Sequence, residues 1–375
     1  MIVFSLIVVL SYLLLIGSFI VGFDKVKSFH LKDVPAKTKF TVVIPFRNEA
    51  ENLPKLLHSI SLLNYPKDLF EVILVDDASE DHSKEIIETF LEENAILNFQ
   101  IVANERQTES PKKDAIDTAI NKAKHEWIIT TDADCVLPKF WLECFDEFIQ
   151  QTDSICIAGP VMYHDGTTFL GRFQQLDLFS LQGAGVGGFG LKKPFLCNGA
   201  NFGYTKTTFQ EVNGFEGNTN ISSGDDIFLL EKFTSKFPDK VHYLKCEKAI
   251  VKTNPQPTWH ELMQQRLRWA SKAKAYNNWI GKLTGIIVLL INILALVLPF
   301  LAIAGLFNFK IWVYLLVIKL NIDFLLLYKT ATFFGQKKAF LSFLTSFSFY
   351  PFFSVHVGLL SLFGGYSWKG RKFKL

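Results

Sequence analysis

This 375-residue chain has only five cysteines, which is too few and too dispersed for a disulfide framework or a zinc site. Their number is odd, and no two of them stand in the C-x-x-C spacing that zinc sites and redox pairs use. The cysteines are Cys135, Cys144, Cys156, Cys197 and Cys246. We therefore expect reduced thiols in a cytosolic domain.

An excess of one charge sign is also missing. The chain has 39 Lys and Arg against 36 Asp and Glu, a net charge of +3. So small an excess gives no support to nucleic-acid binding, and we predict no nucleic-acid partner. The lysines and arginines instead cluster beside apolar segments, as positive-inside loops of membrane proteins do.

The glycine-rich stretch 183–190 lacks the G-K-[ST] ending of a phosphate-binding P-loop. We interpret it as a mobile surface loop or an acceptor-side loop and assign it no chemistry. No internal repeat or low-complexity tract is evident, so the chain is not a solenoid or a linker-rich array.

Long apolar runs are present instead. The chain has 37 phenylalanines and a mean hydropathy of +0.21, yet 20% of its residues are charged, so we expect one globular part and one part in a bilayer. Residues 1–21 are long enough to span a hydrocarbon core of ~30 Å and lack the features of a removable signal peptide. We predict an uncleaved transmembrane anchor at 1–23, with the lysine-rich side after it in the cytoplasm.

Residues 283–363 hold three further apolar stretches, at 283–307, 311–327 and 340–363, the last broken by Pro351. An amphipathic, basic and Trp-rich helix within 256–281 should lie in the headgroup plane just before them. Four full spans would place the basic tail 364–375, with Lys369, Arg371, Lys372 and Lys374, outside the cell. Either the last stretch is re-entrant or interfacial, or the positive-inside tendency fails here.

Residues 38–255 alternate strands with amphipathic helices. The pattern predicts strands at 40–45, 71–75, 99–102 and 126–131, with helices at 51–63, 83–91 and 113–124 between them. Strands separated by helices of this length imply right-handed βαβ crossovers and a mostly parallel sheet, so the fold class is α/β and Rossmann-like.

Two carboxylates, Asp132 and Asp134, stand one residue apart where the fourth strand ends. On a strand they would share a face at the carboxyl end, which is where open α/β sheets bind ligands. Two hard oxygen donors suit a Mg²⁺ or Mn²⁺ ion that completes its coordination with water and substrate phosphates. The alternative for a lone D-x-D is a turn with Asx capping.

Five segments in this order and at this spacing resemble the family 2 glycosyltransferases: Pro45-Phe46-Arg47-Asn48-Glu49, Val75-Asp76-Asp77-Ala78-Ser79, Asp132-Ala133-Asp134, Gly224-Asp225-Asp226 and Gln265-Arg266-Leu267-Arg268-Trp269. With its flanking apolar helices, the chain is similar to membrane-bound members such as cellulose, chitin, hyaluronan and poly-N-acetylglucosamine synthases and ceramide glucosyltransferase. The resemblance implies a GT-A fold at 38–255, a nucleotide-sugar donor (most often UDP-linked), a divalent metal, and inversion at the anomeric carbon.

The resemblance also implies roles on the donor side. Pro45, Arg47 and Glu49 would lie at the donor, with Glu49 near the ribose, and Asp76 would contact the uracil base. Capping of the following helix is the structural alternative for Glu49 and Asp76. Lys113 is similar to the lysine of the family's G-K-x-A-L pattern, although Lys112 stands in place of its glycine and Asp117 in place of an asparagine.

For the chemistry, the resemblance places the metal on Asp134 and Asp132, with Asp132 close to the ribose or the metal. Asp226 would be the base that deprotonates the acceptor. The family usually has Glu where this chain has Asp225, so either carboxylate is a candidate. Arg268 would face the diphosphate, and Gln265 and Trp269 would line the acceptor site.

The hypothesis is thus an inverting hexosyl- or N-acetylhexosaminyltransferase of the cell inner membrane, with a cytoplasmic catalytic domain and a lipid or glycan acceptor. Alternatives are a processive polysaccharide synthase, a catalytically silent GT-A scaffold that supports a partner membrane synthase, and a metal-free glycosidase with paired carboxylates. The sequence does not specify the sugar, the acceptor, the product length or the oligomeric state.

Overall fold

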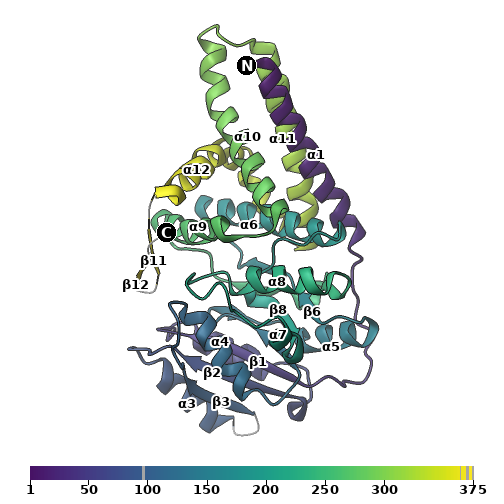
Figure 1. The fold of residues 1–375 in the computed structure, drawn as a ribbon, viewed down its shortest axis with the longest axis vertical. Helices are drawn as coiled ribbons and strands as arrows, with labels where there is room; N and C mark the ends of the chain where they lie inside the picture. Colours follow the sequence, from purple (N-terminus) through teal and green to yellow (C-terminus); the bar gives the residue numbers. More distant parts are fainter. Residues whose placement is uncertain (95–97, 364, 369–370, 374–375) are drawn as a thin grey trace. The chain divides into compact units, whose positions relative to one another are not determined.

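A computed structural model describes residues 1–94, 98–363, 365–368 and 371–373. The chain divides into two compact units, each formed by segments distant in sequence. Residues 27–164 and 197–254 form an α/β unit. Residues 1–26, 165–196 and 255–375 form a helical unit. Figure 1 shows the helices and strands of the two units.

The α/β unit is built on a seven-stranded sheet in the order β3-β2-β1-β4-β8-β6-β9. The pairs β1–β2, β2–β3 and β1–β4 are parallel, as predicted, and β8 is antiparallel to both of its neighbours. The strands are β1 (Phe40–Phe46), β2 (Phe70–Asp76), β3 (Phe99–Ala103), β4 (Trp127–Thr130), β6 (Cys156–Ala158), β8 (Phe202–Thr205) and β9 (Val241–Tyr243).

The crossovers between the parallel strands are helical, because their apolar residues recur at helical spacing and cover the sheet. The α/β helices are α2 (Leu53–Ser61), α3 (Ser83–Glu93), α4 (Pro111–Lys122), α5 (Trp141–Gln151), α7 (Lys206–Glu211) and α8 (Asp225–Lys236). Every residue of β2 is buried, and the main core includes Phe40, Leu53 and Trp141. The carboxyl ends of β1, β2 and β4 therefore face one edge of a rigid sheet.

A small sheet in the order β5-β10-β7 completes the α/β unit. Its strands are β5 (Cys135–Val136), β7 (Val161–Tyr163) and β10 (Val251–Thr253). The five cysteines are free thiols, and the Sγ atoms of Cys144 and Cys246 lie 3.6 Å apart.

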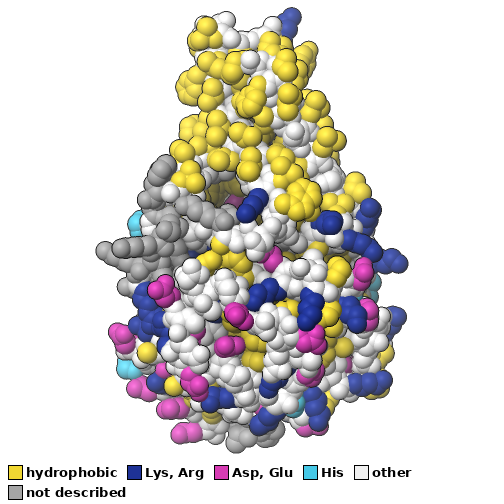
Figure 2. Space-filling model, viewed as in Figure 1, with side chains coloured by type: hydrophobic (Ala, Val, Ile, Leu, Met, Phe, Trp, Pro, Cys, Tyr) yellow, Lys and Arg dark blue, Asp and Glu magenta, His cyan; other side chains and the backbone are white. Residues whose placement is uncertain are grey.

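The helical unit contains four helices that are long and apolar enough to cross a membrane, by length and composition. They are α1 (Ile2–Lys25), α10 (Trp279–Ile303), α11 (Phe309–Phe333) and the segment Lys337–Leu362, which includes α12 (Phe343–Phe363). Figure 2 shows hydrophobic side chains gathered over α1, α10 and α11 with few charged ones among them. Such a surface is suited to lipid contact.

The prediction of a loop at the glycine-rich stretch 183–190 is wrong. These residues form the last part of helix α6 (Phe169–Gly190). Its glycines let α6 pack closely along α1. A Cβ atom added to Gly187 would lie 2.5 Å from the carbonyl oxygen of Phe19, and one added to Gly190 would lie 1.8 Å from that of Gly22. Close backbone packing of this kind is how small residues join helices in membranes.

We expect Gly187→Ala to destabilise the helical unit by about 1–3 kcal/mol, because its new methyl group would overlap a backbone that cannot rotate away. Thermal unfolding of the purified protein in detergent measures this. The matched control is Gly17→Ala on α1, where nothing lies within 4 Å of the added Cβ. Its higher helix propensity should leave stability unchanged or raise it by up to about 1 kcal/mol. Equal melting temperatures for the two variants would contradict the packing.

A polar cluster lies between α1 and α11. The hydroxyl of Tyr12 donates to Asp323 Oδ1 at 2.5 Å, and Lys319 Nζ lies 2.6 Å from Asp323 Oδ2. The ammonium group also lies 4.7 Å from the centre of the Phe347 ring. The charged side chains thus satisfy each other within an apolar bundle, as buried ion pairs must.

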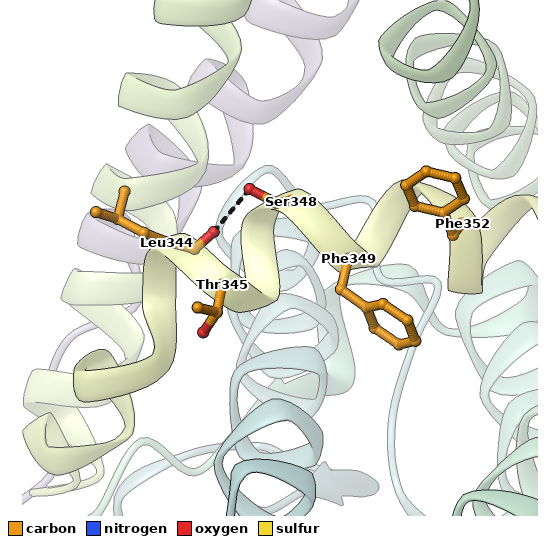
Figure 3. Close-up of a pocket in the computed structure, with 5 residues that line it drawn as sticks. All are labelled: Leu344, Thr345, Ser348, Phe349 and Phe352. Atoms are coloured by element: carbon orange, nitrogen blue, oxygen red, sulfur yellow. Dashed lines mark hydrogen bonds between the residues drawn. The ribbon is translucent and has the colours of Figure 1, made fainter.

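The last apolar stretch forms one helix, α12, and Pro351 lies inside it. A shallow pocket of about 440 Å³ lies along it, with the lining residues shown in Figure 3: Leu344, Thr345, Ser348, Phe349 and Phe352. Of the predicted basic tail, Lys369 and Lys374 lie outside the described residues. The predicted interfacial helix divides into α9 (Trp259–Ser271) and the first turn of α10.

Candidate active site

The predicted metal carboxylates lie in a turn directly after β4. The amide of Cys135 donates to the Asp132 carbonyl at 3.2 Å, so Asp132 and Asp134 are on a turn rather than on the strand itself. Exposure nevertheless alternates, because Ala133 and Cys135 are buried while both aspartates reach the surface. Both aspartates therefore follow the carboxyl end of β4, and their sharing of one face stays a prediction.

The second acidic pair begins helix α8. Gly224 adopts a left-handed backbone (φ 84°) immediately before it, a conformation that glycine tolerates well. Asp225 is buried, whereas Asp226 is partly exposed. Asp226 Oδ2 accepts a hydrogen bond from the amide of Gly199 at 3.0 Å, and both carboxylates lie at the positive end of the helix dipole.

Lys112 joins these two acidic segments. Its ammonium group lies 2.7 Å from Asp132 Oδ1 and 3.2 Å from Asp225 Oδ2. Burial alone would lower the pKa of Lys112, but the charges of Asp132 and Asp225 outweigh it and raise that pKa well above its ordinary value. The structure therefore brings together the D-x-D turn and the start of α8 through one partly buried cation.

Gly199 packs against this cluster of Lys112 and Asp225. A Cβ atom at this position would lie 2.9 Å from Asp225 Oδ2 and 3.5 Å from Lys112 Nζ, so a side chain would displace the carboxylate. The Gly199 carbonyl accepts a hydrogen bond from Thr130 Oγ1 at 2.7 Å, which attaches this loop to the end of β4. Neither Lys112 nor Gly199 was among the residues that the sequence predicts.

The loops after β1 and β2 are interlocked at the same edge of the sheet. Asn48 and Ala78 have positive φ angles of 51° and 56°, which are strained for residues other than glycine. The Asn48 amide donates to Ser79 Oγ at 3.1 Å. Arg47 donates to the carbonyls of Asp77 and Ala78 at 2.6 and 2.5 Å. The Arg47 guanidinium group thus stabilises the loop after β2.

The predicted donor carboxylates have local partners. Asp76 lies 2.8 Å from Lys84 Nζ and accepts the Ser79 amide at 2.9 Å. Burial would raise the pKa of Asp76, but the bonds from Lys84 and Ser79 outweigh it and lower that pKa. Glu49 Oε2 accepts a hydrogen bond from Asn52 at 2.7 Å. The N-cap residues of the helices that follow are Asn52 and His82 rather than Glu49 and Asp76, and the base and ribose contacts stay predictions.

Two other predicted donor residues have structural surroundings. Pro45 lies in β1, opposite Val75 of β2. Lys113 is buried, and its ammonium group donates to the carbonyls of Asn218 and Ile221 at 2.7 and 2.9 Å. The lysine that contacts Asp132 and Asp225 is Lys112, and a donor-binding role for Lys113 remains a prediction.

The Gln265–Trp269 pattern belongs to the helical unit, where it lies on α9. Arg266 forms a buried ion pair with Asp177 of α6 at 2.6 Å. Its guanidinium carbon lies 4.2 Å from the centre of the Trp269 ring, and it donates to the side chain of Gln265. Arg266 therefore positions two members of the pattern, Gln265 and Trp269. The acceptor-side roles of Gln265, Arg268 and Trp269 stay predictions.

Comparison with known proteins decides the family. The model of "Glycosyl transferase family group 2" matches residues 127–334, more than half of the chain, and that of "Glycosyl transferase family 2" matches residues 41–212. The chain is a family 2 glycosyltransferase.

Individual relatives of this glycosyltransferase are distant. Glycosyltransferase AglE of Haloferax volcanii is 26% identical over 230 residues, 61% of this chain and 70% of AglE. The undecaprenyl-phosphate 4-deoxy-4-formamido-L-arabinose transferase of Proteus mirabilis is 36% identical over 103 residues, 27% of this chain and only 30% of that protein. The solved mannosyltransferase PcManGT of Pyrobaculum calidifontis, in complex with GDP-Man and Mn²⁺, is 15% identical with a TM-score of 0.56 over 96% of both chains. This likeness confirms the GT-A fold.

The side chains of this glycosyltransferase supply some, but not all, of the oxygen ligands that a hard divalent cation needs. Asp132 and Asp134 offer carboxylate oxygens, which Mg²⁺ and Mn²⁺ prefer. Among the residues that the structure describes, no group of three or more His, Cys, Asp or Glu side chains is placed to hold a metal. A cation here would therefore need phosphate oxygens and water to complete its coordination, which suits a metal that binds together with a diphosphate.

Proposed function

We propose that this glycosyltransferase is membrane-embedded, moves a hexose or N-acetylhexosamine from a nucleotide-sugar to a lipid or glycan acceptor, and inverts the anomeric carbon. The observation that carries the proposal is the cluster at the carboxyl edge of the sheet, where Lys112 joins Asp132 to Asp225 beside Asp226. Metal-side and base-side carboxylates must flank one sugar in a single displacement, and the contacts of Lys112 with both acidic segments support this arrangement.

The chemistry follows from the side chains. Asp226 accepts the proton of the acceptor hydroxyl, that oxygen forms a bond to C1 of the sugar, and the bond from C1 to the phosphate oxygen breaks on the opposite face. Asp132 and Asp134 would hold the divalent cation, which supplies charge neutralisation for the departing nucleoside diphosphate. The Gly199 amide orients Asp226 through its hydrogen bond to Oδ2.

The membrane part of the proposal rests on the four apolar helices and on lipid-linked chemistry in a relative. The Proteus mirabilis protein is named for transfer to undecaprenyl phosphate, a polyprenyl lipid. In this proposal the α/β unit faces the cytoplasm, where nucleotide-sugars are made. The donor is expected to be UDP-linked, and GDP-linked sugars are the second class because PcManGT is in complex with GDP-Man.

A radiolabelled donor panel tests the function. Membranes containing the protein are incubated with UDP- and GDP-sugars and Mn²⁺ or Mg²⁺, and the products are partitioned between organic solvent and water. Label in the organic phase would identify a lipid acceptor, and label in water-soluble polymer would identify a polysaccharide synthase. Nucleotide binding without transfer of any sugar would instead support a silent scaffold. Hydrolysis of a glycoside to free sugar that survives chelation, without transfer, would support a metal-free glycosidase.

A further inference from the structure

We propose that Lys112 is a resident counter-cation of the active site, which keeps a free divalent cation out until a nucleoside diphosphate arrives. When the diphosphate binds with its metal, the Lys112 ammonium group leaves the Asp132 carboxylate and pairs with a phosphate oxygen. The inference rests on the proposed function, because the metal and the diphosphate are those of the transfer reaction. It adds an order of binding, in which the metal enters together with the donor.

The position of Lys112 in the first turn of α4 places its side chain beside the carboxylates of Asp132 and Asp225. Lys112 follows Pro111, whose fixed φ angle suits the first turn of α4. Ala115 and Ile116 are buried and anchor the same helix against the sheet. The side chain of Lys112 is 19% exposed, compared with 36% for Asp132 and 9% for Asp225. The ammonium group thus lies between a carboxylate that opens to solvent and one that does not.

One cation at a time fits this position. The Lys112 ammonium group is 2.7 Å from Asp132 Oδ1, and a Mg²⁺ ion on the same carboxylate would lie about 2.0–2.1 Å from its oxygen. Two positive charges that share one carboxylate lie within about 5 Å and repel strongly in a partly buried site. A diphosphate reverses this balance, because its negative charges can pair with both cations.

The two adjacent lysines have different partners, which supports a specific role for Lys112. Lys113 is bonded to the carbonyls of Asn218 and Ile221 and lies 4.8 Å from the centre of the Phe228 ring. Lys112 instead contacts Asp132 and Asp225.

Calorimetric titration of the purified full-length protein in detergent with Mn²⁺ alone tests the inference. Lys112→Met removes the charge and keeps the length of the side chain, so it should bind Mn²⁺ alone at least about tenfold more tightly than the unaltered protein. The matched control is Lys122→Met on the same helix, which removes an ion pair with Glu105 at the surface. It should leave Mn²⁺ affinity unchanged. Equal affinities for the unaltered protein and Lys112→Met would overturn the inference.

A second pair of variants keeps the test valid if Lys112→Met alone unfolds, since that change leaves Asp225 buried without Lys112. Asp225→Asn and the double variant Lys112→Met/Asp225→Asn differ by the one lysine, and the double variant should again bind Mn²⁺ about tenfold more tightly. Each titration is repeated with UDP and with GDP. If the unaltered protein binds no Mn²⁺ in the presence of either nucleotide, the proposed function fails. If it binds Mn²⁺ with a nucleotide, and the Lys112 variants have the same affinity for Mn²⁺ without nucleotide, only this inference fails.

Discussion

Asp226→Asn should lower the rate of sugar transfer by about 10²- to 10⁴-fold, because it removes the base that deprotonates the acceptor. Asparagine keeps an oxygen that can accept the Gly199 amide, so the loop beside α8 should keep its position. The measurement is the initial rate with a labelled donor at saturating acceptor. Binding of UDP or GDP in the presence of Mn²⁺ should stay within about threefold, since the acceptor side alone is changed.

Asp225→Asn is the matched comparison, because the two aspartates are adjacent in the first turn of α8. Asp225 is the more buried of the two, and its carboxylate is paired with Lys112 at 3.2 Å. We therefore expect a smaller loss of rate together with a lower melting temperature, as for other buried ion pairs that lose one partner. If Asp225→Asn loses the transfer activity and Asp226→Asn keeps it, Asp225 is the base and the assignment reverses.

The parallel part of the α/β unit could be predicted from the sequence, for a physical reason, although residues 165–196 of the predicted domain 38–255 belong to the helical unit. Strands of a parallel sheet are buried on both faces and therefore read as continuous apolar runs. The run at 71–75 lies within β2, which is buried throughout and ends at Asp76. Because such strands end where polar residues begin, the same runs also locate the edge of the sheet where the site lies.

Helix α6 could not be predicted in this way. Glycine is a poor helix former, so its abundance at 183–190 suggests a loop when only the sequence is considered. In the structure these glycines lie against α1, where a Cβ atom on Gly187 would overlap Phe19. The favourable packing comes from a helix more than 160 residues away in the sequence, and no local pattern reports it.

Within the site, the choice between Lys112 and Lys113 likewise depends on packing that a local sequence pattern does not report. Successive residues of a helix point in directions about 100° apart, so only one of two adjacent lysines can face a given cluster. A family pattern favours Lys113, whereas the direction of α4 places Lys112 on Asp132 and Asp225. That direction depends on how the helix packs on the sheet, which the pattern of residues does not contain.

Asp134→Ala should abolish detectable transfer at ordinary metal concentrations, because the chain supplies few carboxylates for the cation. Within the described residues no group of three or more His, Cys, Asp or Glu side chains is placed to hold a metal, so the loss of Asp134 is not compensated. With UDP or GDP present, Mn²⁺ affinity should fall at least about 100-fold, since even outer ligands of metal sites change affinity by 10- to 100-fold.

Calorimetry with Mn²⁺ and the nucleotide measures the loss of affinity at Asp134, and transfer assays across a wide range of Mn²⁺ concentrations measure its consequence. Asp68→Ala, which removes an exposed carboxylate in the short helix Lys67–Leu69, is the control and should behave as the unaltered protein does. Chelation should likewise stop transfer by the unaltered protein, and added Mn²⁺ should restore it. Transfer that persists both in Asp134→Ala and after chelation would contradict the metal role. The charge of the leaving diphosphate would then be neutralised by side chains alone. Lys112, whose ammonium group already contacts Asp132, would be the first residue to test for that role.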